Sequence, residues 1–312
     1  MTYAFLNGNF LPTEDAKVGV MTHALHYGTS VFEGIRANWN PEQEKLYVFQ
    51  PREHYERLLR GCKMLRINLP YTAEDLTQIT LDLVEKCGHK QDIYIRPLAF
   101  KGAERVAVLK LQDLEDSIVI FTIPLGAYLD LEAAANCCTS SWRRIDHNMM
   151  PPSVKVGGNY VNSVLAKTEA TLAGFDEAIL LTQDGYVAEG TGENIFAFIN
   201  GQLVTPALSD NILGGITRNA VIEIASNELG ITTIERGMRR SELYFADEIF
   251  LTGTAAHLTP VGHIDNLAIS TGEIGPITRK LQNLYFDVIR GRIPKYQHWC
   301  TAVLPADGNE SS

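Results

Sequence analysis

The sequence has no long apolar run and no excess of basic residues, and each absence excludes a class of function. No stretch of its 312 residues approaches the ~20 consecutive apolar residues that a membrane-spanning helix needs. Residues 1–7 carry neither the basic region nor the apolar segment of a secretory signal. The net charge is -10, whereas nucleic acids and anionic membranes bind basic faces. We therefore expect a cytoplasmic protein that binds small molecules, not nucleic acid or membrane.

Cysteine and histidine are also sparse. The five cysteines, an odd number that includes the neighbours Cys137 and Cys138, match neither a disulfide framework nor a metal-binding spacing. The eight histidines include no His-Glu-x-x-His pattern. We expect no metal site, and we expect reduced, partly buried thiols.

The chain is too long for one hydrophobic core, and its composition of 45% hydrophobic and 21% charged residues is that of a globular protein. A continuous apolar run at 117–123 is typical of a buried strand, and breaker residues follow it. We predict an N-terminal domain at 1–123, a linker at 124–133 and a C-terminal domain at 134–312. Residues 306–312 of the latter would form a disordered tail.

Hydrophobic periodicity predicts helices and strands in both domains, and hence an α/β (α+β) fold. The expected helices are 51–64, 73–87, 162–173, 217–229 and 276–289. The expected strands include 92–100, 117–123, 136–142 and 248–251. Hairpin turns are expected at 183–185 and 200–201, which makes the second domain rich in antiparallel strands.

The segment from Pro151 to Tyr160 presents one lysine, Lys155, between two valines and just before Gly157-Gly158. A lysine amine acts as a nucleophile only when desolvation or a nearby cation lowers its pKa, and the valines could supply that desolvation. Glycines allow the backbone to approach a flat ligand, and Tyr160 offers a phenol. The segment predicts a Schiff-base lysine, although most lysines in loops are surface residues.

Two turns rich in small residues are candidates for anion binding. The loop 211–217 runs into a helix, so its backbone N–H groups would face a phosphate, unless it is a plain loop capped by Thr217. The turn at Thr254 follows the strand 248–251 and could form a second anion-binding nest. Arg57 is the natural cationic partner of a phosphate, or else a solvated surface group.

Two carboxylates, Glu189 and Glu193, lie at a strand end bordered by glycines. A carboxylate that faces a pyridine nitrogen keeps that nitrogen protonated, and so strengthens the ring's capacity to hold a carbanion's electrons. Glu189 faces the same way as Val187 in an otherwise apolar strand, which favours this role for it. For Glu193 we favour an exposed acid in a turn.

Taken together, these residues resemble the class IV (fold-type IV) pyridoxal-phosphate-dependent aminotransferases, and most closely the branched-chain amino acid aminotransferases. The resemblance runs from about residue 5 to about residue 290. Its most specific segments are THALHYGTSVFEGIR at 22–36, YIRP at 94–97 and AEGTGEN at 188–194.

The resemblance implies the two-domain fold of the D-amino acid aminotransferases, with a smaller N-terminal α/β domain and a larger C-terminal domain that contains a barrel-like mixed sheet. It also implies pyridoxal 5'-phosphate as the cofactor and a homodimer or higher homo-oligomer. Lys155 would be the Schiff-base lysine, Tyr160 would bond the phenolic oxygen and Glu189 would pair with the ring nitrogen. The residues that would hold the phosphate are Arg57, Gly215, Ile216, Thr217 and Thr254.

The activity implied by the resemblance is transfer of the amino group of L-branched-chain amino acids to 2-oxoglutarate in a ping-pong cycle. The residues that would meet the substrate are Tyr27, Phe32, Gly34, Tyr94, Arg96, Tyr128, Thr254 and Ala255. The chain departs from many branched-chain enzymes at the loop 101–110, where they carry a glycine-rich loop. It departs again at Leu125, where an aromatic residue is frequent, and we hypothesise a wider pocket there.

Several alternatives remain open from the sequence. The nearest are other enzymes of this fold, namely a D-amino acid or (R)-amine transaminase and an aminodeoxychorismate lyase. A nucleotide-binding module lacks support, because neither G-x-G-x-x-G after a first strand nor G-x-x-x-x-G-K-[ST] is present. A catalytically silent cofactor carrier is the third alternative.

Overall fold

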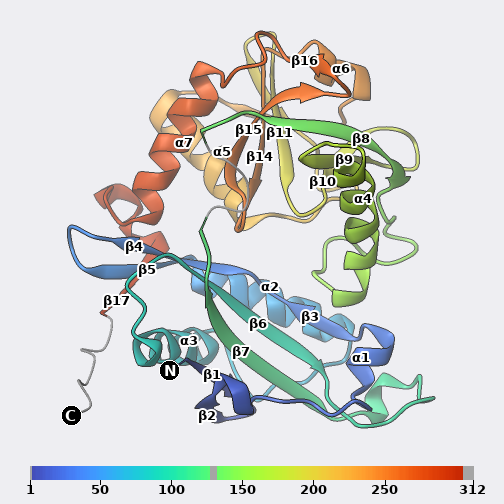
Figure 1. Ribbon diagram of the computed structural model, residues 1–312, viewed down its shortest axis with the longest axis vertical. Coiled ribbons are helices and arrows are strands. Elements are labelled where there is room, and N and C mark those ends of the chain that lie inside the picture. Colours follow the sequence, from blue (N-terminus) through green and yellow to red (C-terminus); the bar gives the residue numbers. More distant parts are fainter. Residues whose placement is uncertain (1, 127–131, 305–312) are drawn as a thin grey trace. The chain divides into compact units, whose positions relative to one another are not determined.

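The structure is a computed structural model that describes residues 2–126 and 132–304 (Figure 1). The described residues divide into two compact units, and the first contains 2–126, 154–158 and 287–304. The second contains 132–153 and 159–286. The domain boundaries expected at 123 and 134 stay a prediction. The expected tail, and 127–131 of the expected linker, lie outside the described residues.

The first unit is built on an eight-stranded sheet, with strand order β17, β5, β4, β6, β7, β1, β2 and with β3 paired to β6. All of these pairs are antiparallel. The strands are β1 (Tyr3–Leu6), β2 (Asn9–Pro12), β3 (Ser30–Phe32), β4 (Ile35–Asn40), β5 (Lys45–Phe49), β6 (Ile93–Lys101), β7 (Asp116–Pro124) and β17 (Cys300–Val303). The α-helices among them are α1 (His23–Tyr27), α2 (Pro51–Met64) and α3 (Ala73–Cys87), and the 3₁₀ helices are η1 (Thr13–Asp15), η2 (Leu111–Asp113) and η4 (Pro294–Trp299).

Local sequence explains the two long helices that pack on this sheet. Helix α2 has proline in its first turn, where the missing N–H costs nothing, and it buries Tyr55 and Leu58 on its apolar face. Helix α3 begins with a capping box in which Thr72 and Asp75 satisfy each other's backbone N–H groups, and it ends at the left-handed Gly88. Both helices bury their apolar stripes in one core with the sheet.

The second unit contains a nine-stranded mixed sheet, with strand order β10, β9, β8, β15, β14, β11, β12, β13 and with β16 paired to β15. The strands are β8 (Ala135–Arg143), β9 (Glu177–Leu181), β10 (Val187–Gly190), β11 (Asn194–Ile199), β12 (Gln202–Thr205), β13 (Thr233–Glu235), β14 (Glu248–Gly253), β15 (His257–Ile264) and β16 (Leu267–Ala268). The helices are η3 (Gly157–Asn159), α4 (Tyr160–Leu172), α5 (Ile216–Leu229), α6 (Arg240–Tyr244) and α7 (Pro276–Ile289); η3 and α7 extend into the first unit. Helix α4 connects the parallel neighbours β8 and β9, and it lies alongside them in Figure 1.

This sheet is curled, which fits the barrel-like sheet predicted from the sequence. Strand β10 lies at one edge and β11 is the sixth strand along, yet only the three residues 191–193 connect them. Five strand spacings in a flat sheet would cover roughly 24 Å. The chain from Gly190 to Asn194 reaches at most about 14 Å. The sheet must therefore bend until β10 approaches β11, and residues of the two strands are in contact.

Most of the elements expected from the sequence are present. Helices α2, α3 and α7 have the predicted bounds, and α4 begins at Tyr160, two residues before the expected start. Both predicted hairpins are antiparallel pairs, β9 with β10 and β11 with β12. The fold class predicted from the sequence is confirmed.

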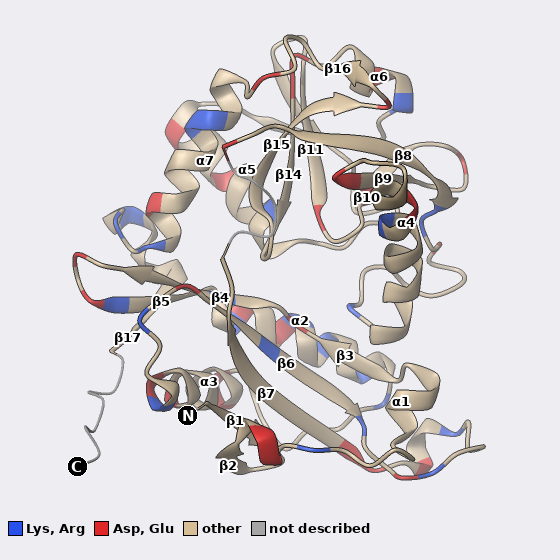
Figure 2. Ribbon diagram, in the orientation of Figure 1, with Lys and Arg blue, Asp and Glu red and all other residues tan. Residues whose placement is uncertain are grey.

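The described residues contain no helix that is both long and apolar enough to cross a membrane. Lys and Arg residues are interspersed with Asp and Glu along the elements of both units (Figure 2). All five cysteines are free thiols, and four of them are buried, as expected. Burial raises the pKa of Cys62 and Cys300 to about 12.

A core leucine of the curled sheet gives the first prediction. Leu251 on β14 is fully buried, so Leu251→Ala leaves a cavity and should cost about 2–5 kcal/mol of unfolding free energy. Leu172, at the end of α4, is 84% exposed and provides the matched control, with an expected change within about 0.5 kcal/mol. Urea unfolding of the two variants measures the difference. Equal losses would contradict the assignment of Leu251 to the core.

Candidate active site

Lys155 is attached to the first unit by main-chain contacts. The carbonyl oxygen of Lys155 accepts a hydrogen bond from the N–H of Phe32 at 3.1 Å, and Val156 forms a β-bridge with Val31. The N–H of Gly158 donates to the carbonyl oxygen of Gly28 at 3.2 Å. A Cβ atom on Gly28 would lie 2.8 Å from the Cα of Gly158, so only glycine permits this approach. These main-chain contacts therefore fix the position from which the Lys155 side chain extends.

The side chain of Lys155 extends over the ring of Phe32, with Nζ 5.2 Å from the ring centroid. The guanidinium carbon of Arg96 lies 4.4 Å from the same centroid. Arg96 also donates two hydrogen bonds to the hydroxyl of Tyr94, at 2.8 and 3.2 Å. Gly34 leaves room for that hydroxyl, because a Cβ there would lie 2.3 Å from it. The structure thus brings five of the predicted site residues together.

Arg57 is paired with a buried carboxylate that the sequence analysis missed. Its Nε and Nη2 atoms each lie 2.7 Å from a carboxylate oxygen of Glu33, a bidentate geometry that orients the guanidinium. His54 lies 2.7 Å from the same carboxylate, one helical turn before Arg57 on α2. Burial alone would raise the pKa of Glu33, but Arg57 and His54 hold it well below its usual range.

Two predicted substrate residues are not placed with this cluster. Tyr27 is 41% exposed on α1; its hydroxyl accepts from the N–H of Ala107 at 2.9 Å, and its ring lies beside His23. Tyr128 lies outside the described residues.

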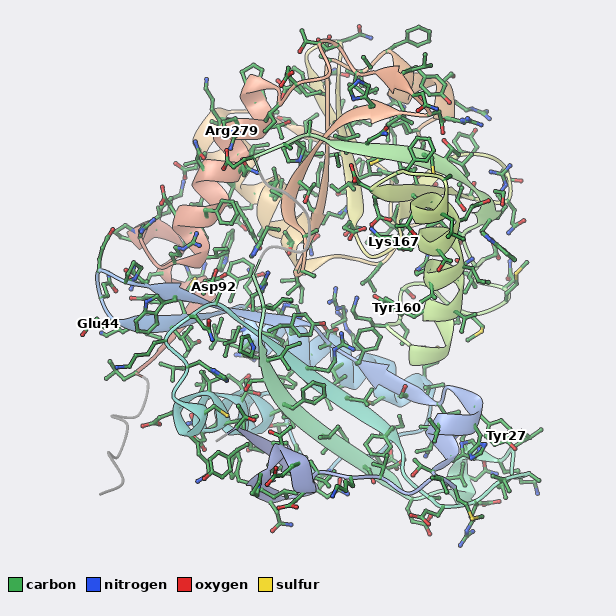
Figure 3. All side chains as sticks on the ribbon, viewed as in Figure 1. Tyr27, Glu44, Asp92, Tyr160, Lys167 and Arg279 are labelled. Carbon is green, nitrogen blue, oxygen red and sulfur yellow. The ribbon has the colours of Figure 1, made fainter. Side chains whose placement is uncertain are left out.

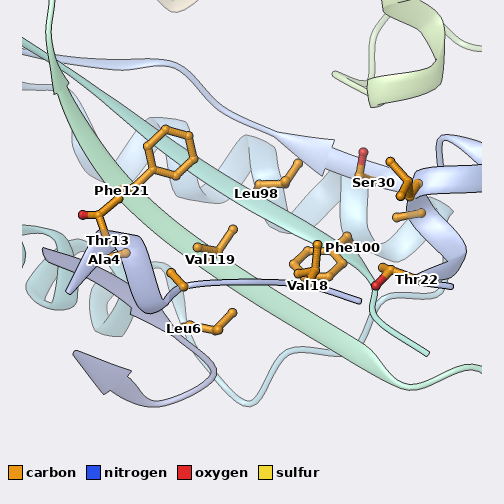
Figure 4. A pocket seen from close by; sticks show the side chains of 13 residues that line it. Ala4, Leu6, Thr13, Val18, Thr22, Ser30, Leu98, Phe100, Val119 and Phe121 are labelled. Atoms are coloured by element: carbon orange, nitrogen blue, oxygen red, sulfur yellow. The ribbon is translucent and has the colours of Figure 1, made fainter. Parts of the chain in front are cut away.

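A separate apolar cavity of about 460 Å³ occurs in the first unit (Figure 4). Its lining includes Leu98, Phe100 and Val119 from β6 and β7, and it includes none of the predicted site residues. Binding sites usually combine apolar walls with a few converging polar groups. We assign no function to this cavity.

In the second unit, Glu189 on β10 is buried and both of its oxygens are engaged. One accepts from the guanidinium of Arg144 at 2.8 Å. The other accepts from the amide of Asn194 at 3.1 Å and from the N–H of Leu213 at 3.0 Å. An opposite charge and hydrogen bonds both favour the ionised form of a carboxyl group. The side chain is therefore held in place by groups that favour its ionised form.

The predicted phosphate loop lies beside Glu189. The amide of Asn194 donates to the carbonyl oxygen of Leu213 at 2.8 Å as well as to Glu189, so one side chain connects the strand end to the loop. Gly215 is the N-cap of α5 and supplies no side-chain cap, and the following Ile216 and Thr217 are buried in the first turn. Backbone N–H groups in the first turn of a helix have no acceptor within the helix.

The turn with Thr254 and Ala255 lies at the same end of the sheet. Strands β14 and β11 pair with Thr252 opposite Asn194, and a Cβ on Gly253 would lie 3.5 Å from Cγ of Glu193. The second unit therefore gathers Glu189, the helix start and this turn.

Tyr160, the remaining predicted cofactor residue, is half-buried at the first position of α4. Figure 3 shows it at one end of that helix, with Lys167 farther along. Arg144 lies 3.4 Å from the side-chain oxygen of Asn162 on the same helix. The Arg144 that holds Glu189 thus also contacts α4.

Sequence reasoning missed three titratable residues and misplaced a fourth. Glu33, His54 and Arg144 were not singled out, although His54 and Arg57 stand three residues apart on one helix, which was a usable signal. The expectation that Glu193 is exposed is wrong, because its exposed fraction is 5%. The turn folds the side chain of Glu193 back over Gly190, so that a Cβ on this glycine would lie 2.8 Å from the carboxylate.

The buried Glu33 network gives the second prediction. Glu33→Gln leaves Arg57 buried without its counter-charge, which should lower the unfolding free energy at pH 7 by about 3–5 kcal/mol. The stability that Glu33 contributes is complete above its unfolded-state pKa of 4.5, and it is lost as the pH falls below that value. The difference in unfolding free energy between wild type and Glu33→Gln should therefore become smaller in acid.

The control for this prediction is Glu56→Gln on the same helix. Glu56 pairs with Arg52 at 3.1 Å, but both side chains are more than half exposed, so the expected loss is below about 1 kcal/mol. Thermal unfolding between about pH 3 and pH 7 measures both variants. If the stability difference between Glu33→Gln and wild type stayed constant across this pH range, the stabilising role of the ionised Glu33 would be refuted.

Comparisons with known proteins identify the family of this chain. The family model described as amino-transferase class IV matches residues 30–264. A probable branched-chain-amino-acid aminotransferase of Aquifex aeolicus is 51% identical over 97% of each chain. The crystal structure of a branched-chain aminotransferase from Thermoproteus uzoniensis with norvaline superposes with a TM-score of 0.92, at 44% identity over 96% of this chain and 99% of the other.

A second solved structure contains the cofactor. It is the branched-chain amino acid aminotransferase of Thermobaculum terrenum in its pyridoxal-phosphate form, with a TM-score of 0.91 and 37% identity over 96% of this chain and 98% of the other. Pyridoxal phosphate, predicted from the sequence, is the cofactor of this family. The chain belongs to the class IV aminotransferases and, within them, to the branched-chain-amino-acid aminotransferases.

Proposed function

We propose that this protein transfers the amino group of L-leucine, L-isoleucine and L-valine reversibly to 2-oxoglutarate in a ping-pong cycle. The observation that carries the proposal is the amine of Lys155, which lies over the ring of Phe32 next to Arg96. The 51% identity to a probable branched-chain-amino-acid aminotransferase supports the substrate class. The relative with norvaline supports it too, because norvaline is an aliphatic amino acid.

The side chains fit pyridoxal phosphate. An anion is favoured at the start of α5, where Gly215 leaves the first-turn N–H groups of Ile216 and Thr217 without a side-chain cap. Glu189 is a buried carboxylate, which is the group that a protonated ring nitrogen needs. Arg57 is oriented by Glu33 and would add a cation for the phosphate, with Thr254 as a further donor. Tyr160 would bond the phenolic oxygen.

When bound, pyridoxal phosphate supplies an aldehyde that condenses with amines and a ring that withdraws electrons from the substrate α-carbon. Lys155 would hold the cofactor at rest through its amine. With substrate bound, the Nζ atom of Lys155 would take the α-proton of the substrate and later donate it, as general base and general acid. Glu189 would hold its charge and position throughout.

The substrate would be met by two sets of groups. Phe32, Gly34 and Tyr94 are proposed to line the site together with Arg96, and the backbone of Thr254 and Ala255 is proposed to bind the substrate carboxylate. Tyr27 and Tyr128 remain proposals, as does a homodimer that completes the site. The exposed position of Tyr27 on α1 is compatible with a role toward a second copy of the chain.

The third prediction tests the lysine. Borohydride reduction of the protein with pyridoxal phosphate should give one pyridoxyl adduct on Lys155, because reduction makes a Schiff base permanent, and peptide mass spectrometry locates the adduct. Lys155→Ala should lower transamination of L-leucine by at least about 10³-fold. Lys63→Ala, which removes an exposed lysine on α2, is the control.

Two results would contradict this proposal. An adduct on another lysine would refute the role of Lys155. Faster turnover of D-alanine or (R)-1-phenylethylamine than of L-leucine would replace the branched-chain specificity with that of a related enzyme.

The fourth prediction concerns the pocket width. Leu125 is half-buried at the end of the first unit, and its N–H donates to the carbonyl oxygen of Asp92 at 3.2 Å, so its backbone is fixed while its side chain can be exchanged. We expect wild type to accept L-phenylalanine at a rate comparable with that for L-leucine. Leu125→Trp should lower kcat/KM for L-phenylalanine by about tenfold or more and leave L-leucine unchanged. A strict aliphatic preference in both proteins would refute the hypothesis.

A further inference from the structure

Glu189 belongs to a group of five charged residues in the second unit, which we call the Glu189 cluster. Its members are three carboxyl groups, Glu177, Glu189 and Glu193, and two cations, Arg144 and Lys167. The three carboxyl groups are 0%, 5% and 5% exposed. Carboxylates at such depth require a cation, hydrogen-bond donors or a proton.

Two of the three carboxyl groups have a cation of their own. Arg144 pairs with Glu189 at 2.8 Å, and Lys167 pairs with Glu177 at 2.7 Å. Glu177 also accepts from the N–H of Ala178 and the hydroxyl of Thr191, each at 2.7 Å. Both carboxyl groups therefore have a counter-charge and hydrogen-bond donors from the protein.

Glu193 differs from its two neighbours. Its carboxylate accepts from the N–H of Gly192 at 3.0 Å, and among the described residues no cation lies within ion-pair distance of it. The charges that act on Glu193 are those of Glu177 and Glu189, which repel its anion, and that of Lys167, which attracts it. The thiol of Cys137 on β8, also buried, is a further titratable neighbour.

The charges of the cluster decide where one proton is held. Three carboxylates and two cations would leave one uncompensated negative charge in the interior, and one bound proton removes it. Lys167 and Arg144 already balance Glu177 and Glu189. Burial, followed by repulsion from Glu177, raises the pKa of Glu193 to about 8. The contacts and the raised pKa therefore point to the same carboxyl group, Glu193, as the neutral one.

We propose that Glu193 is a positioning residue that holds a proton at neutral pH, so that Glu189 beside it remains a carboxylate. An ionised Glu193 would add a second negative charge near Glu189 and would shift Glu189 toward its protonated form. A protonated Glu189 no longer favours a proton on the ring nitrogen of the cofactor. The consequence for the cofactor rests on the proposed function, whereas the protonation of Glu193 does not.

The first test is the pH dependence of stability in Glu193→Gln, measured on the purified full-length protein. Glu193 ionises near 4.5 when unfolded and near 8 when folded, so wild type loses stability as the pH rises between these values. Glutamine does not titrate and avoids this loss. The melting temperature of Glu193→Gln relative to wild type should rise from about pH 5 to about pH 8 and stay level above that.

The control is Glu242→Gln. Glu242 pairs with Arg236 at 2.6 Å, and hydrogen bonds from Arg236 lower its pKa, so its contribution does not change above about pH 5. Its melting temperature relative to wild type should therefore be constant over the same range. A constant or falling difference for Glu193→Gln would overturn the proposal.

A second measurement keeps the proposal testable if Glu193→Gln does not fold. Infrared spectra of wild type at about pH 6 and pH 10 should differ by a protonated-carboxyl band that disappears with a midpoint near 8. The absence of any such band would overturn the proposal.

The cofactor itself gives the third readout. The dissociation constant of pyridoxal phosphate is measured by fluorescence titration of the apoenzyme. It should increase between pH 7 and pH 9 in wild type, which means weaker binding, and stay constant in Glu193→Gln. Equal weakening in both proteins would overturn the positioning role. Failure of the proposed function would appear differently, as no cofactor binding at either pH, and the stability and infrared results would then still report on Glu193.

Discussion

A carboxylate cannot remain ionised inside a protein without donors or a counter-charge, and this constraint shapes the surroundings of one buried glutamate in each unit. Glu189 has a donor at each oxygen, from Arg144 on one side and from Asn194 and Leu213 on the other. Glu33 is engaged in the same way by Arg57 and His54. The partners of Glu189 come from three segments of the second unit, whereas Glu33, which follows β3, takes both of its partners from α2. These contacts therefore also fix the segments relative to one another within each unit.

The curled sheet of the second unit explains why so many functional groups can lie close together. The turn between β10 and β11, the turn after β14 and the start of α5 are distant in sequence. Strand pairing of β11 with β14 brings the two turns to one sheet end, and Asn194 connects them to the helix start. The closeness of the Glu189 carboxylate, the start of α5 and the amides of the turn after β14 therefore follows from the register of β11 against β14.

Sequence reasoning reached the helices and the hairpins, because these depend on local patterns, and the site residues that it named stay a prediction. Helical periodicity gave the bounds of α2 and α3, and the glycines around Glu189 indicated a close approach. The partners of the charged residues were not accessible in this way. Arg144 lies 45 residues before Glu189, and Glu33 lies 24 residues before Arg57, so nothing local indicates either pair. Burial of Glu193 likewise depends on how the turn folds back, which composition cannot show.

The contact between Gly28 and Gly158 makes the position of the reactive lysine independent of the side chains that line the pocket. The origin of the Lys155 side chain is set by main-chain atoms, through the bonds of Gly158 to Gly28 and of Phe32 to Lys155. Evolution can therefore exchange the walls of the pocket, and with them the preferred amino acid, while the reactive nitrogen keeps its anchorage on the sheet.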